Sequence, residues 1–68
     1  MDINIRSAVI SNLQNSSSDS IRSTIEDAMS IGEEKVLPGL GVMFEVLWKK
    51  ASPDLKKTIV SHITESLK

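Results

Sequence analysis

Apolar residues recur along the first half of the chain at the three- and four-residue spacing of amphipathic helices. The pattern predicts a helix over residues 3–14, capped by Asp2 or Asn4, with a buried face of Ile5, Ala8, Val9 and Leu13. A polar run then predicts a loop. A second helix, residues 18–31, is predicted to begin at Ser17 or Ser18 and to bury Ile21, Ile25, Ala28 and Met29. Gly32 stands where a left-handed glycine ends a helix.

Residues 33–41 are predicted to form a connector. Leu37 precedes a proline, which disfavours helical backbone, and Pro38-Gly39 is a strong turn signal. Gly39 and Gly41 are expected to let the backbone approach its neighbours closely where the chain turns into the next helix. The alternative is a weak anion site at that helix N-terminus, although the glycines match no phosphate-binding fingerprint.

The third predicted helix, residues 41–50, is apolar over most of its circumference. Its apolar residues are Val42, Met43, Phe44, Val46, Leu47 and Trp48. Glu45 and Lys49, four residues apart, mark the one clearly polar stripe. Such a helix must be covered on several sides, so we expect it to be the central element of the fold.

The fourth helix is predicted over residues 53–67. Ser52, Pro53 and Asp54 supply a cap, a first-turn proline and a first-turn acid, and the apolar stripe is Leu55, Ile59, Val60, Ile63 and Leu67. Strand-like alternation is not recognisable in the sequence. The predicted fold is therefore all-α, a compact bundle of about four short helices around the apolar third helix.

Composition limits the chemistry of this bundle. The chain has 68 residues, 40% of them hydrophobic and 25% charged, which indicates a single globular domain spanning residues 1–68. It has no cysteine and one histidine. Disulfides and zinc sites built on thiolates are therefore excluded, and we expect neither a metal site nor a cofactor.

Hydropathy and the N-terminal sequence predict an intracellular protein without a membrane span or secretory signal. Charge is divided unevenly. Residues 1–34 hold two basic and six acidic side chains, a net charge of −4, whereas residues 35–68 hold six basic and three acidic ones, a net charge of +3. The two halves are expected to complement each other, since the overall charge of −1 lacks the basic excess typical of nucleic-acid-binding domains.

Two surface features suggest partners. Lys49, Lys50, Lys56 and Lys57 flank the turn between the third and fourth helices and could contact phosphates, with Trp48 as a stacking platform, which makes weak nucleic-acid binding an alternative function. If the other helices fail to cover the third one, the residues left for a partner or a homodimer are Phe44, Leu47 and Trp48. A monomer and a homodimer both remain open.

Catalysis is not indicated by the sequence. His62 lies beside Ser61 on one predicted helix, where neighbouring side chains diverge by about 100° and cannot converge on one reacting atom. The adjacent carboxylates Glu26-Asp27 and Glu33-Glu34 diverge in the same way. We therefore predict no catalytic residue and no small-molecule substrate.

The chain resembles the minor small acid-soluble spore protein I family of Bacillus-type bacteria. The resemblance rests on the central segments Gly32-Glu33-Glu34, Leu37-Pro38-Gly39-Leu40-Gly41-Val42, Phe44-Glu45 and Trp48. It extends to the opening Met1-Asp2, Asn4, Arg6, Ala8-Val9 and Asn12. The resemblance implies a non-enzymatic protein of the forespore and spore core, involved in sporulation, with no established biochemical role and no functional residues to transfer.

Overall fold

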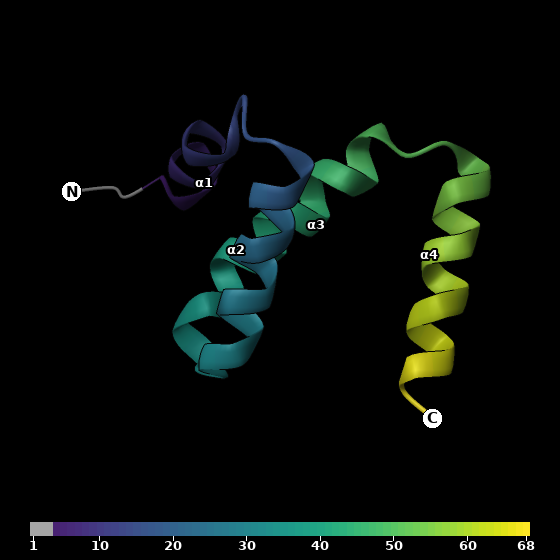
Figure 1. Cartoon of the computed structure of the whole chain (residues 1–68). Coiled ribbons are helices and arrows are strands. Elements are labelled where there is room, and N and C mark those ends of the chain that lie inside the picture. The colour runs from purple at the N-terminus through teal and green to yellow at the C-terminus, as the bar shows by residue number, and fades with distance from the viewer. Residues whose placement is uncertain (1–3) are drawn as a thin grey trace.

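The computed structural model describes residues 4–68 and contains four α-helices and one short 3₁₀ helix (Figure 1). The elements are α1 (Ile5–Leu13), α2 (Ser18–Ile31), η1 (Glu34–Val36), α3 (Leu37–Lys50) and α4 (Pro53–Ser66). Strands are absent from the described part of the chain. The predicted all-α class and the number of helices are thus confirmed.

Local capping explains where three of the helices begin. The side chains of Asn4, Ser17 and Ser52 accept hydrogen bonds from backbone N–H groups three residues further on, at 3.0, 3.1 and 3.1 Å. Gly32 ends α2 in the left-handed conformation, with φ of +66°. The predicted caps and this C-terminal glycine are confirmed; Asp2, the other candidate cap of the first helix, lies outside the described residues.

The predicted start of the third helix was wrong. α3 begins at Leu37 rather than at residue 41, and Leu37 itself has helical dihedral angles, with φ of −59° and ψ of −40°. Pro38 lies in the first turn, where its missing N–H would have no helical acceptor and its fixed φ suits the helix. The connector therefore shortens to the segment around η1, which leads directly into α3.

The two glycines of this segment also have a different role from the one expected. Gly39 and Gly41 lie inside α3, and a β-carbon built on either would meet no atom within 4 Å. Close backbone approach is therefore not their function in a single chain. The glycine-flanked anion site loses its basis too, because the helix N-terminus lies at Leu37.

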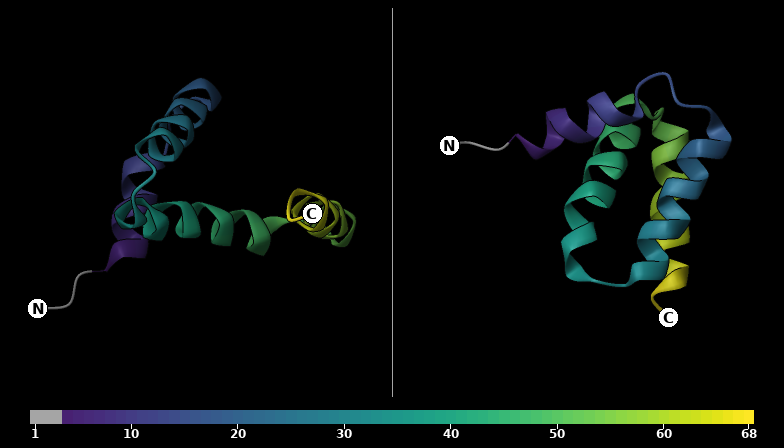
Figure 2. Two further views of the ribbon diagram at one scale, coloured as in Figure 1. Left: turned by 90° about the horizontal axis from the view of Figure 1, so that it is seen from below. Right: turned by 60° about the vertical axis from the view of Figure 1, so that its left-hand side comes forward.

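α3 occupies the centre of the arrangement. α1 crosses and packs on it, α2 is joined to its N-terminal end through η1 and diverges from it, and α4 extends from its far end, apart from α2 (Figures 1 and 2). The radius of gyration is 13.3 Å, whereas a compact domain of this length is expected to have about 11 Å. The helices are thus grouped around α3 in an open arrangement.

Burial is correspondingly slight. Val42, on the α3 face toward α1, is 8% exposed and is the one buried residue among residues 4–68. Large apolar side chains on all four helices remain more than a third exposed. The apolar stripes of one chain therefore lie near one another but do not form a closed hydrophobic core.

Candidate interaction surface

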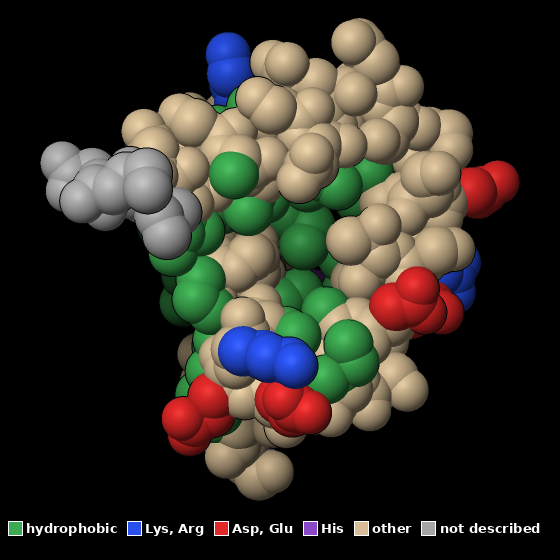
Figure 3. All heavy atoms as spheres, turned by 90° about the vertical axis from the view of Figure 1, so that its left-hand side faces the viewer, with side chains coloured by type: hydrophobic (Ala, Val, Ile, Leu, Met, Phe, Trp, Pro, Cys, Tyr) green, Lys and Arg blue, Asp and Glu red, His purple; other side chains and the backbone are tan. Residues whose placement is uncertain are grey.

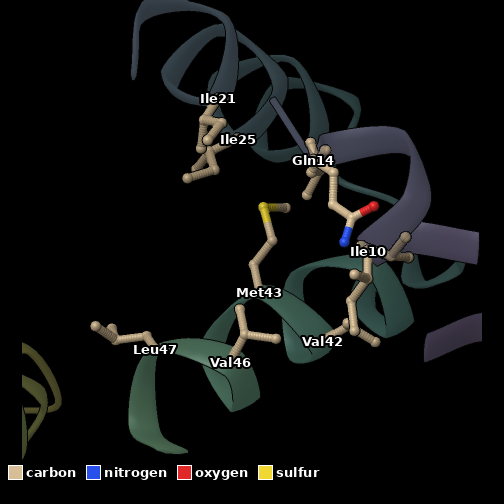
Figure 4. A pocket seen from close by; sticks show the side chains of 10 residues that line it. Ile10, Gln14, Ile21, Ile25, Val42, Met43, Val46 and Leu47 are labelled. Carbon is tan, nitrogen blue, oxygen red and sulfur yellow. The ribbon is translucent and has the colours of Figure 1, made fainter. Parts of the chain in front are cut away.

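An apolar concavity lies where α1, α2 and α3 face one another. We call it the apolar groove; its volume is about 450 Å³. Gln14 is the one polar residue along it, and the apolar ones are Val9, Ile10, Leu13, Ile21, Ile25, Val42, Met43, Val46 and Leu47. In Figure 4 Met43 extends from α3 toward Ile21 and Ile25 of α2, while Leu47 points away from the other labelled side chains.

The groove is part of a wider apolar face. Figure 3 shows hydrophobic side chains gathered in a hollow on the face that carries α1 and α2, with acidic and basic side chains around its margin. Ile25, Val46 and Leu47 each stay more than a third exposed. An apolar hollow with a charged rim is the usual anatomy of a protein contact surface.

The predicted partner face falls on two sides of α3. Leu47 borders the apolar groove, whereas Phe44 and Trp48 line a second concavity between α3 and α4 together with Val60 and Ile63. Phe44 and Leu47 are each 43% exposed, and Trp48 is half-buried. The other helices thus leave α3 incompletely covered, which is the condition under which a partner face was expected. Partner binding itself stays a prediction.

Two aromatic rings shape the α3–α4 side. Phe44 and Trp48 stack with ring centroids 5.7 Å apart and an interplanar angle of 27°, which follows from their four-residue spacing on one helix. Lys56 from α4 lies over the indole, its Nζ atom 5.4 Å from the ring centroid. These contacts orient the first turns of α4 against the end of α3.

Arg6 of α1 forms a forked ion pair with Glu45 of α3. The Arg6 Nε atom donates to Glu45 Oε1, and Nη2 donates to Oε2 at 2.9 Å. The hydrogen bond from Arg6 lowers the pKa of Glu45 and correspondingly raises the pKa of Arg6. Lys49, the expected partner of Glu45, is secondary, with Nζ 3.5 Å from Oε1. Sequence reasoning missed the pair with Arg6.

The four lysines predicted as phosphate contacts lie at the α3–α4 corner. Lys49 is engaged with Glu45, and Lys56 lies over one face of the Trp48 ring. Lys50 and Lys57 are exposed. Two of the four charges and one face of the aromatic platform are thus already used within the chain.

Groups suited to catalysis are scattered. His62, Glu26 and Glu33 are all exposed, on different parts of the molecule, and none of them lines the apolar groove. Across residues 4–68, no three side chains of the metal-ligating types lie close enough to hold an ion. Within the same range, no helix combines the length and hydropathy that crossing a membrane requires.

Comparison with known proteins identifies relatives of the chain. The family model for small, acid-soluble spore protein I matches residues 3–67. The chain is 48% identical over 67 residues to small, acid-soluble spore protein I of Shouchella clausii, covering 98% of this chain and 97% of that protein. It is 48% identical over 68 residues to the protein of the same name in Bacillus velezensis, covering 100% and 96%.

A third relative agrees. The small, acid-soluble spore protein I of Bacillus mycoides is 46% identical over 68 residues, covering 100% of this chain and 99% of that protein. No solved structure matches the chain. The resemblance inferred from residues 32–48 is confirmed over nearly the whole sequence, and the chain belongs to the small, acid-soluble spore protein I family.

Proposed function

We propose that this spore protein acts without catalysis, through protein contacts made by its exposed apolar surface, in the forespore and spore core. Family membership makes it a sporulation-related spore protein, and the family is not a known enzyme family. The observation that carries the proposal is the apolar groove, which gathers nine apolar side chains and one amide but no acid, base or nucleophile.

The alternative is weak nucleic-acid binding through Lys49, Lys50, Lys56 and Lys57. What favours it is their position, since the two-residue link between α3 and α4 brings all four to one corner. What opposes it is the contact of Lys56 with Trp48 and of Lys49 with Glu45.

A titration with duplex DNA at two salt concentrations, about 50 and 200 mM, separates the two functions. The proposal predicts no binding at the lower salt concentration. Binding that weakens steeply with salt, and that disappears when the four lysines are replaced by glutamine, would establish the alternative and refute the proposal.

The compartment has its own test. Spores are stripped of their coats chemically and the remaining cores are broken and extracted with acid. The proposal predicts the protein in the core extract, with synthesis confined to the forespore during development. Recovery of the protein in the coat fraction would contradict it.

A further inference from the structure

A single copy of the chain exposes more surface than a folded monomer of its size. Its accessible surface is 5803 Å², whereas a compact monomer of 7.5 kDa is expected to expose about 4,250 Å². The excess is about 1,500 Å², and a standard interface buries roughly 800 Å² on each partner. The chain therefore has enough uncovered area for a stable dimer interface.

Part of the uncovered surface is apolar and lies on two features. One is the apolar groove on α1, α2 and α3. The other is the stripe of α4, where Leu55, Val60 and Ile63 are all more than 40% exposed although they recur at helical spacing. An isolated 14-residue helix is marginal in water, and most helical stability comes from packing of its apolar face. α4 lacks such cover in one chain.

We propose that a second copy of this chain supplies the cover, its α4 lying in the apolar groove. α4 has the same length of 14 residues as α2 and α3, which form two sides of the groove. Each copy offers one groove and one α4, so two reciprocal contacts close a two-fold dimer without leaving a free end. This inference rests on the proposed function, because it names the partner that the contact surface takes.

Cysteine trapping tests the arrangement, because the native chain contains no cysteine. Ile25→Cys places a thiol in the groove, and Ile63→Cys places one on the apolar stripe of α4. The two variants are mixed in equal amounts and oxidised gently with a glutathione redox buffer. A mixed disulfide then reports a contact between two copies, since neither variant can form it alone.

The matched control is Ile25→Cys mixed with Ser61→Cys. Ser61 lies on the same helix but about 160° around it from Ile63, on the polar side. We expect the Ile25–Ile63 mixture to form its mixed disulfide at least about tenfold faster than the control, because thiol exchange requires contact. Equal rates in the two mixtures would overturn the arrangement.

The wild-type chain provides a check that does not depend on cysteine variants. Amide hydrogen exchange in α4 should slow as the protein concentration rises from about 10 to about 1,000 µM, since association protects the helix. Exchange independent of concentration would overturn the dimer. Equal cross-linking rates or concentration-independent exchange would refute the dimer alone, and the proposed function would stand as long as DNA does not bind. Salt-sensitive DNA binding would refute the proposed function whatever the cross-linking shows.

Discussion

Replacing glycine with alanine tests the position of α3, because the expected change in the free energy of unfolding has opposite signs at Gly41 and Gly32. In Gly41→Ala, the new β-carbon enters open space inside a helix. Alanine is favoured over glycine in a helix interior by about 0.5–1 kcal/mol, so the free energy of unfolding should rise by that amount. In Gly32→Ala the backbone is held at φ of +66°. The left-handed conformation costs alanine about 1–2 kcal/mol, so stability should fall.

The two variants and the wild type are compared by urea unfolding followed through circular dichroism at one protein concentration. For a domain of this size, a change of 1 kcal/mol shifts the melting temperature by about 4–8 °C, which gives a thermal check on the same samples. Gly39→Ala provides a second site inside α3, also with open space around the added carbon.

A Gly41→Ala variant destabilised to the same extent as Gly32→Ala would contradict the position of α3. That outcome would mean either that the segment before residue 41 is not helical, or that another chain approaches the glycine closely. Gly32→Ala with unchanged stability would contradict the left-handed end of α2.

Three further predictions concern single contacts. Arg6 lowers the pKa of Glu45 in the folded chain. The stability that this ion pair contributes is therefore present above the ordinary glutamate pKa of about 4.3 and is lost as the pH falls below that value. Glu45→Gln should make stability fall less steeply at acid pH, and an unchanged acid dependence would contradict the ion pair. Ser52→Ala should cost about 1 kcal/mol in urea unfolding through the lost cap of α4, and no loss would exclude that cap. Lys56→Ala should cost about 0.5 kcal/mol and shift Trp48 emission to longer wavelength; identical emission spectra would show that Lys56 does not cover the indole.

The local features of the fold could be predicted because each depends on a few neighbouring residues. The caps at Ser17 and Ser52 and the left-handed Gly32 are satisfied within one turn of helix. The start of α3 could not be predicted, because Pro38 and Gly39 suit a turn and a first helical turn equally well. The preceding 3₁₀ turn, which carries the chain into helical geometry at Leu37, decides between them.

Contacts distant in sequence were inaccessible for another reason. Arg6 and Glu45 are 39 positions apart, and no spacing rule connects them. The sequence correctly indicated that the third helix needs cover on several sides. It could not reveal whether that cover comes from the same chain, since a stripe of apolar residues carries no record of the surface that buries it. Phe44 and Leu47 stay exposed in one copy, so a single chain does not cover its third helix completely.

We propose that one chain forms its helices but leaves its apolar surface to be covered by a second copy. Sedimentation equilibrium on the wild-type chain, across a hundredfold range of concentration, tests this most directly. We expect a species of about twice the 7.5 kDa chain mass, which dissociates on dilution and loses helical circular dichroism as it does so. A species of one chain mass at every concentration, with full helicity, would contradict it.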